Sequence, residues 1–450
     1  MRDLLGNRLI YRNGNITHMD NPMKKIISQL NTQTSILIIF SVIIHILVLK
    51  NVFFISKDMI YGDSSSVNIS SRPLYGYMRI PISILAKKYY AENRLAADFA
   101  QIYFPSKNFS SLSTTYQDGY LDPWGRPSRY APLLHFICSI TLCKLNYGIA
   151  SFLHMVIQIL IFYFVLFVSF RLLSIEKNFL FGLTLANICM FLTPAGLSWF
   201  ERGQFSIYVS VSYILIILGL NKSNLLLVIL SALFAFIKWT SLPFILVILS
   251  VYILNSNTFS EIKKHISYSV IFFLVILSLS LCFPENSYYF FIGLMKQEKD
   301  LSPAGVSLLF YLPREVVKLS PIILILLGYV YGKINQNIAY WMVPFLLGAA
   351  VFLLMYPTKA YEYNIPSLLC FIPFIIHWEK SSINIINSSV VNIAKYLFYL
   401  FLCYSLINSV LNINPMNEYL LTAIIFLTFP LIPLMFIKIR HLKENIIGYK

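Results

Sequence analysis

Charged residues are scarce in this sequence. Only 12% of its 450 residues are Asp, Glu, Lys or Arg, whereas a soluble globular domain carries about 25%. Hydrophobic residues make up 58% of the chain, and the mean hydropathy is +0.70. Apolar runs of helix-spanning length recur along it. This composition excludes an ordinary soluble enzyme and predicts an all-α, polytopic integral membrane protein.

The motifs of the common soluble enzyme classes are also missing. The sequence has no Walker loop, dinucleotide-binding glycine fingerprint, Cys-x-x-Cys pair, His-Glu-x-x-His or Gly-x-Ser-x-Gly. Its six cysteines lie in or beside apolar runs without metal-type spacing. We therefore interpret them as small buried apolar residues. The isolated His135 and His154 are interpreted as structural residues.

Acidic residues are the rarer of the two charge types, and the formal net charge is +16. A strongly basic chain is a candidate for nucleic-acid binding. Here, however, the basic residues are scattered and many flank apolar runs, as the orientation signals of membrane proteins do. We therefore expect contact with lipid headgroups and no nucleic-acid partner.

About twelve apolar stretches approach the roughly 20 residues that a helix needs to cross the hydrocarbon core. The predicted spans are 34–55, 149–172, 179–195, 204–220, 223–238, 241–255, 266–283, 320–333, 338–356, 363–378, 390–411 and 418–438. Lys and Arg in short loops favour the cytoplasm. The sequence thus predicts a cytoplasmic tail over 1–33, a transmembrane domain over 34–438 and a second cytoplasmic tail over 439–450.

The same alternation assigns the conspicuous polar stretches to the outer face. The predicted external segments are 56–148, 196–203, 238–240, 284–319, 357–362 and 412–417. The first is long for a connector, and such loops are usually functional. Within it, 73–90 suits a segment lying in the membrane interface, and 122–127 is a turn cluster. Residues 132–143 are apolar but too short to span, which predicts an interfacial or re-entrant helix.

Asp98 is the first candidate for chemistry, because it is the one acid in a stretch of alanines and aromatics. An acid that faces a partly dry cavity can serve as a general base. A helix cap or an exposed charge is the alternative interpretation. Asp118 and Asp122 are rivals, but their glycine and proline neighbours are typical of turns.

Two later span junctions carry further candidates. Glu201, Arg202 and Gln204 meet at the first, where a surface contact between the two charges is the alternative to a ligand site. Gly203 predicts a helix break that exposes backbone groups. Lys238 interrupts about thirty apolar residues, and charge in such a region is a functional hypothesis by default. Its alternative role is to extend toward the outer headgroups, beside an interfacial tryptophan.

The last junction runs from Tyr356 to Asn364 and mixes aromatic, charged and amide side chains. Lys359 and Glu362 are three residues apart and could pair with each other. The alternative is a sugar site, because flat rings stack on sugar faces while carboxylates and amides bind hydroxyl groups.

In this order, the motifs resemble those of polyprenyl-phosphate-dependent membrane glycosyltransferases of the C-type superfamily, most closely glycosyltransferase family 87. The first outer segment begins this pattern with Asp98-Phe99 and Tyr103 and ends it with Tyr130-Ala131-Pro132. The later features are Gly203-Gln204 at the start of a span, Lys238 followed by Pro243, and the stretch from Pro357 to Asn364. The late motif departs from the family pattern, with Tyr361, Glu362 and Tyr363 where tryptophan and histidine are frequent. No Asp-x-Asp pair accompanies Asp98, so no divalent metal and no cofactor is assumed.

The resemblance implies a multi-pass plasma (inner) membrane enzyme with both termini cytoplasmic. It would transfer a hexose or pentose from a polyprenyl-phosphate donor to a cell-envelope glycan or glycolipid, at a site facing the periplasm or exterior within 56–148. Asp98 would be the general base. The departing phosphate is assigned to Arg202, Lys238, Arg129 and Lys359. Substrate binding is assigned to Tyr103, Tyr130, Glu201, Gln204, Tyr361 and Glu362.

Two other classes fit much of the same pattern. A flippase or transporter of a lipid-linked glycan also has many spans and basic residues, although the halves of this chain show no repeat of the kind common in transporters. A polymerase or ligase of lipid-linked polysaccharide uses outer loops in the same way. A cavity with Asp98 beside a basic cluster would favour the transferase.

Overall fold

The computed structural model describes residues 22–61, 96–107, 128–300, 303–334, 338–382, 388–403 and 415–429. This part of the chain is almost entirely helical, as predicted. Its strands, β1 (Ala304–Gly305) and β2 (Lys359–Ala360), are two residues each and pair in parallel. The tail over 439–450, the interfacial segment 73–90 and the turn cluster 122–127 lie outside the described residues.

The amino-terminal half consists of α1 (Pro22–Tyr61), α3 (Ala97–Lys107), α4 (Pro132–Ile140), η4 (Leu142–Lys144), α5 (Tyr147–Leu172), η5 (Glu176–Asn178), α6 (Phe179–Phe191), α7 (Pro194–Glu201), α8 (Ser206–Asn221) and α9 (Leu225–Ile237). The carboxy-terminal half consists of η6 (Trp239–Ser241), α10 (Leu242–Leu254), α11 (Phe259–Leu281), α12 (Pro284–Asp300), η7 (Leu308–Phe310), α13 (Arg314–Ile334), α14 (Ile338–Leu354), η8 (Glu362–Cys370), α15 (Phe371–Ser382), α16 (Ser388–Leu402) and α18 (Pro415–Thr428).

Several described helices have the length and apolar composition of membrane spans. Four qualify individually: Ile38–Lys57 within α1, α5, α11 and α13. The segment Glu176–Phe191 and α7 together form a fifth candidate, bent by 71° at the break. Shorter apolar helices include α8, α9, α14 and the segment Trp239–Leu254. These helices fit a polytopic membrane protein, while the count of twelve spans stays a prediction.

Local sequence signals explain where helices begin. Asn146 caps α5 by accepting a hydrogen bond from Ile149 N, and Asn224 caps α9 in the same manner. Thr258 and Glu261 form a reciprocal capping box at α11. Helices α4, α7 and α10 begin with a proline in the first turn, where its missing N–H costs nothing.

One predicted span differs in kind from an α-helix. Residues 363–378 begin as the 3-10 helix η8 and continue as α15 only from Phe371. Pro366 lies inside η8, and a proline removes a backbone donor and disfavours the helical region for the residue before it. The tighter, irregular segment leaves polar groups of this stretch available for contacts outside the helix.

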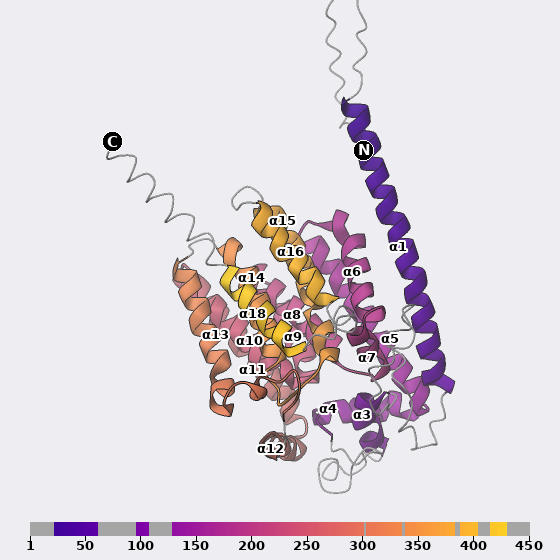
Figure 1. Cartoon of the computed structure of the whole chain (residues 1–450). Coiled ribbons are helices and arrows are strands. Elements are labelled where there is room, and N and C mark those ends of the chain that lie inside the picture. Colours follow the sequence, from indigo (N-terminus) through magenta and orange to yellow (C-terminus); the bar gives the residue numbers. More distant parts are fainter. Residues whose placement is uncertain are drawn as a thin grey trace, which may run out of the picture.

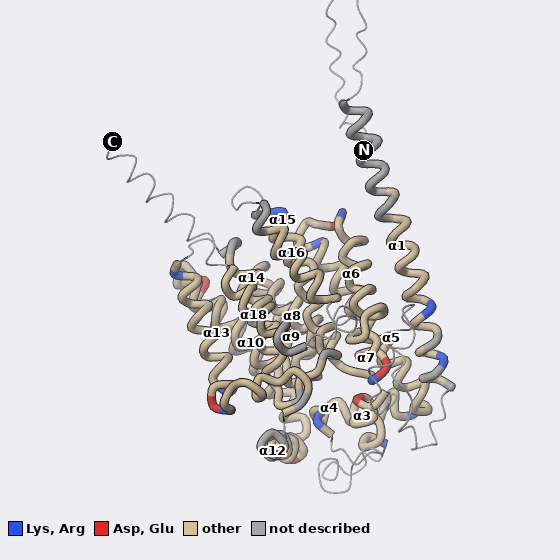
Figure 2. Tube along the Cα trace, viewed as in Figure 1, with Lys and Arg blue, Asp and Glu red and all other residues tan. Residues whose placement is uncertain are grey.

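Helices from two of the segments predicted to be external lie at one end of the bundle (Figure 1). Helices α3, α4 and α12 lie together at the lower end in this view. The β1–β2 pair joins the predicted external segments 284–319 and 357–362 to each other. Described charged residues lie mostly near the two ends of the bundle, whereas its middle is largely uncharged (Figure 2). Which end faces the cytoplasm stays a prediction.

The interpretation of all six cysteines as buried apolar residues is wrong for part of the set. Cys138 and Cys143 form a disulfide, with their Cα atoms 5.2 Å apart. The chain turns at Thr141 between α4 and η4, which brings the two residues within disulfide range. Cys282 is exposed, whereas Cys189 and Cys370 are buried free thiols as expected.

Candidate functional site

The amino-terminal end of α3 docks on the link between α7 and α8. Ala96 N donates to Glu201 O at 2.8 Å, and Asp98 N donates to Arg202 O at 2.9 Å. Gly203 follows with φ +65°, and a Cβ atom there would lie 2.9 Å from Phe99 Cβ. Glycine adopts this left-handed conformation without steric cost. The glycine therefore permits the close approach that carries the Asp98 side chain to the α7–α8 link.

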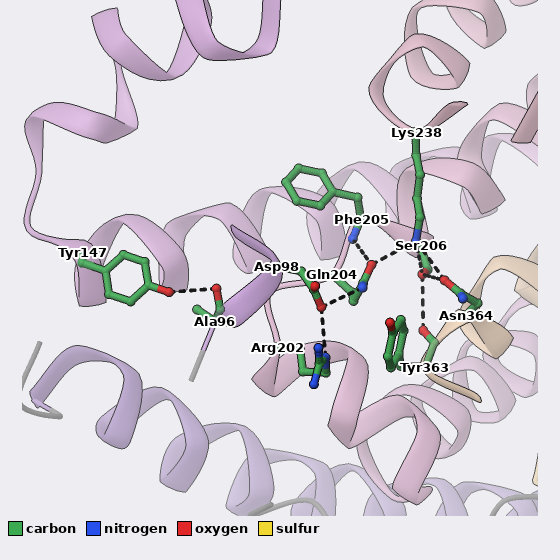
Figure 3. Close-up of polar contacts among 10 residues, drawn as sticks. All are labelled: Ala96, Asp98, Tyr147, Arg202, Gln204, Phe205, Ser206, Lys238, Tyr363 and Asn364. Carbon is green, nitrogen blue, oxygen red and sulfur yellow. Dashed lines mark hydrogen bonds and ion pairs between the residues drawn. The ribbon is translucent and has the colours of Figure 1, made fainter. Parts of the chain in front are cut away.

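The Asp98 carboxylate is held by two side chains from that link (Figure 3). Its Oδ2 atom accepts a hydrogen bond from Arg202 Nε at 3.0 Å and from Gln204 Nε2 at 2.7 Å. Asp98 is only 6% exposed. The Arg202 guanidinium also lies over the ring of Tyr363, 5.0 Å from its centroid. Arg202 thus orients the carboxylate and compensates its charge.

Gln204 continues the network from Asp98 toward Lys238. Its Oε1 accepts from Lys238 Nζ at 2.9 Å, while its Nε2 is the atom that donates to Asp98. Lys238 Nζ also donates to Ser206 Oγ at 3.2 Å and to Asn364 Oδ1 at 2.9 Å. An ammonium group has three protons, so these three oxygens use its full donor capacity. One side-chain amide therefore joins the acid to the lysine.

This network forms one wall of a cavity of about 220 Å³. That volume is more than ten times the roughly 10–15 Å³ that holds a single water molecule. The polar lining residues are Asp98, Gln101, Arg129, Tyr130, Gln204, Ser206, Tyr213, Lys238, Thr240, Tyr363, Asn364 and Ser367. The rest of the lining is largely apolar: Val209, Trp239, Ala350, Leu353, Leu354 and Pro357. A ligand with a polar group and an apolar part fits such a lining.

The structure brings some of the predicted site residues together at this cavity. Arg129 and Tyr130 line it beside Asp98, Gln204 and Lys238. The Tyr130 ring packs against Phe205, with centroids 4.4 Å apart.

Other predicted site residues lie elsewhere. Tyr103 is buried among aromatic rings and donates from its hydroxyl to Leu145 O at 2.6 Å. Glu201 is fully buried and is not part of the cavity lining. Tyr361 stacks on Tyr363 at 5.1 Å, and only Tyr363 lines the cavity. The side chains of Lys359 and Glu362 lie outside the described part of the structure.

A second set of contacts fixes the segment that carries Arg129 and Tyr130. His135 is fully buried, its Nδ1 lies 2.8 Å from Ser106 Oγ, and its Nε2 lies 2.7 Å from Ser128 Oγ. Burial lowers the pKa of His135 to about 3, so the ring is neutral at physiological pH. His135 thus ties the end of α3 to the residue preceding Arg129.

Sequence reasoning missed several residues of the cavity as individual candidates. Gln101 lies one helical turn after Asp98 on α3, a spacing that places both on one helix face. Asn364 ended a stretch already singled out, but its amide was not chosen. Nothing in the sequence distinguished Ser206 from other serines at span junctions, because its role depends on where Lys238 reaches.

The composition of the cavity gives no sign of a metal centre. Among the described residues, no group of three His, Cys, Asp or Glu side chains could hold a metal ion. No model of a known protein family, no curated protein and no solved structure matches this chain. The function of the cavity must therefore be argued from its own geometry.

Proposed function

We propose that this protein is a membrane glycosyltransferase that moves a sugar from a polyprenyl-phosphate donor to a cell-envelope glycan or glycolipid. One observation carries the proposal: Asp98 and Lys238 lie in the wall of a single cavity and are linked through Gln204. An acid and a cation held a fixed distance apart suit a reaction that deprotonates one oxygen while another gains negative charge.

In the proposed reaction, the Asp98 carboxylate takes the proton of an acceptor hydroxyl. The acceptor oxygen bonds to the anomeric carbon, and the bond between that carbon and the phosphate oxygen breaks. Its electron pair stays on the departing lipid phosphate. Protonated Asp98 and the free polyprenyl phosphate therefore balance the atoms and charges of the step.

Lys238 is the cation proposed to stabilise the departing phosphate. To do so, its ammonium must exchange one of its three oxygen partners for a phosphate oxygen. Ser206 can be released, because its oxygen only accepts from Lys238, while its own proton is donated to Tyr363 O at 3.3 Å or Asn364 Oδ1 at 3.0 Å. Lys238 would thus reach the phosphate without leaving the serine hydroxyl unpaired.

Arg202 receives a different role from the one the sequence suggested. Its Nε is bonded to Asp98 and its guanidinium covers the Tyr363 ring. We therefore assign it to holding the base, and we assign the remaining cationic contact with the donor to Arg129 at the cavity lining. Bidentate arginine contacts are well suited to phosphate.

The disulfide supports an outer-face location for this end of the protein. Cys138 and Cys143 lie in the predicted first external segment, and disulfides persist mainly in oxidising compartments. To test the orientation, Ser113→Cys is labelled with a membrane-impermeant thiol reagent in a background without accessible native thiols. Labelling in intact cells is expected. Labelling only after the membrane is opened would place the cavity on the inner side.

The transferase itself is tested by mass spectrometry of cell-envelope glycans from cells with wild-type protein, without it, and with Asp98→Asn. We expect a glycan that loses one sugar both without the protein and with the variant. Unaltered glycans together with a loss of lipid-linked glycan at the outer leaflet would favour a flippase instead.

A further inference from the structure

Gln101 is a cavity residue that the mechanism above does not use. It lies on α3 (Ala97–Lys107) three residues after Asp98, so the two side chains project from one face of the helix. Gln101 is 7% exposed and lines the cavity together with Asp98. Gln101 is therefore a largely buried residue of the same cavity wall as the proposed base.

The Gln101 amide differs from its neighbours in having no hydrogen-bond partner among the described residues. The amides of Gln204 and Asn364, in the same cavity, both bond to other side chains. Burying an unsatisfied amide costs free energy, and such groups in proteins are normally paired. A largely buried amide that opens on a cavity forms its hydrogen bonds with what the cavity holds, which is water or a polar ligand that displaces it.

The residues around Gln101 indicate the chemistry of that ligand. The Tyr130 ring lines the same cavity and packs against Phe205, with centroids 4.4 Å apart. The basic residues of the lining, Lys238 and Arg129, are assigned above to the donor phosphate. An amide that both donates and accepts, in a lining that also holds an aromatic ring, suits a hydroxyl-rich group such as a sugar.

We propose that Gln101 binds a hydroxyl of the acceptor sugar adjacent to the hydroxyl that Asp98 deprotonates; this rests on the proposed transferase function. Side chains three residues apart on a helix have Cβ atoms about 5–6 Å apart, and each can reach one of two neighbouring sugar hydroxyls. A carboxamide both donates and accepts. Gln101 thereby discriminates an acceptor with this hydroxyl from one that lacks it.

The test is binding of soluble sugar probes to the purified full-length chain in lipid nanodiscs. The probes are the methyl α-glycosides of mannose, glucose and galactose, with their monodeoxy forms, titrated by saturation-transfer NMR. Gln101→Ala and the near-isosteric Gln101→Met remove the amide. Lys107→Ala, at an exposed position at the end of the same helix and outside the cavity lining, is the control.

We expect wild type to bind at least one glycoside, and both Gln101 variants to bind it about tenfold more weakly, the loss of one good hydrogen bond. Lys107→Ala should bind like wild type. Removal of one particular hydroxyl from the glycoside should weaken its binding to wild type by a similar factor and leave its binding to Gln101→Ala unchanged. That coupling would not arise from a purely structural role.

Equal affinities for wild type and the Gln101 variants, or no glycoside binding to wild type at all, would overturn the inference. Envelope glycans provide the separate test of the transferase. Unaltered glycans in Asp98→Asn cells would remove the function on which the inference rests. Altered glycans in Asp98→Asn cells, combined with glycoside binding that does not depend on Gln101, would overturn the inference about Gln101 and leave the proposed transferase function standing.

Discussion

Two of the polar networks in the described part of the chain differ in charge and surroundings. The first joins Asp98 to Asn364 through Gln204 and Lys238 and lines a cavity. The second lies between α1, α5 and α6, among apolar helix faces. This second network contains only neutral or weakly basic groups. The two networks therefore allow functional and structural polar contacts to be compared within one protein.

The second network is internally complete. His45 Nδ1 donates to Ser41 O at 2.6 Å, and Asn187 Nδ2 donates to His45 Nε2 at 3.0 Å. Tyr163 donates its hydroxyl to Asn187 Oδ1. Ser41 Oγ lies 2.9 Å from Thr184 Oγ1. Each ring nitrogen of His45 has a partner, and none of these residues lines the cavity.

The comparison separates two uses of polar side chains in a membrane protein. Hydrogen bonds between apolar helices hold the helices together and are individually modest. Charged groups that face a cavity are costly to keep there and are functional candidates by default. The two networks should therefore respond differently to substitution, one in activity and the other in stability.

The largest expected effect is that of Asp98→Asn. The substitution keeps the size of the side chain and its ability to accept hydrogen bonds from Arg202 and Gln204, but it removes the base. General base catalysis contributes about 10²–10⁴-fold, so sugar transfer should fall by that factor. Product glycan measured by mass spectrometry, normalised to membrane-inserted protein, is the readout.

Asp98→Glu serves as the companion variant. A longer side chain displaces the carboxylate from the 2.6–3.2 Å range that proton transfer requires, so it should recover little activity. A fully active Asp98→Asn protein would show that the base lies elsewhere in the molecule.

Lys238→Met should have the next largest effect. The apolar stem remains, while the oxygens of Gln204, Ser206 and Asn364 lose their shared donor. The variant also loses the proposed bond to the departing phosphate. A hydrogen bond to a charged group contributes about 1.5–3 kcal/mol, so product formation should fall roughly 10–100-fold, more than stability falls. Lys264→Met, at a partly exposed lysine that bonds Ser223 Oγ outside the cavity lining, is the control. Normal transfer by Lys238→Met would show that the ammonium only supports the network of Gln204, Ser206 and Asn364.

Asn187→Leu should have the smallest effect on activity and a clear effect on stability. It removes the partner of His45 Nε2 and of the Tyr163 hydroxyl. Such contacts are worth about 0.6 kcal/mol on average and up to about 1.7 kcal/mol in membrane proteins. Unfolding in mixed detergent micelles should show a loss of roughly 1–2 kcal/mol with sugar transfer unchanged. A large loss of transfer in stably folded Asn187→Leu would mean that the two networks are coupled.

Much of the fold was predictable because burial in a membrane constrains composition strongly. An apolar run of helix length has few other stable conformations in lipid, so the helical segments follow from hydropathy. The 3-10 helix at 362–370 was not predicted as such, since its apolar composition resembles that of a span. Pairing of Cys138 with Cys143 was also missed, because it depends on the turn at Thr141 after α4.

The candidate site was predictable only for residues whose charge is anomalous in an apolar chain. Asp98, Arg202 and Lys238 were conspicuous for this reason, and the structure places all three in one network. Tyr103 matched a motif yet packs among aromatic rings away from the cavity. Gln101 matched no motif, because an unpartnered amide is recognisable only when its surroundings are known.

The sequence by itself determined the class of this protein, a chain of apolar helices with a few costly charges at their ends, because hydropathy and charge act through composition and local spacing. Tertiary structure alone decided which of those charges meet. Asp98 and Arg202 are 104 residues apart, and Lys238 and Asn364 are 126 apart. Contacts over such separations depend on how α3, the α7–α8 link, the end of α9 and η8 pack around one cavity, which no local pattern encodes.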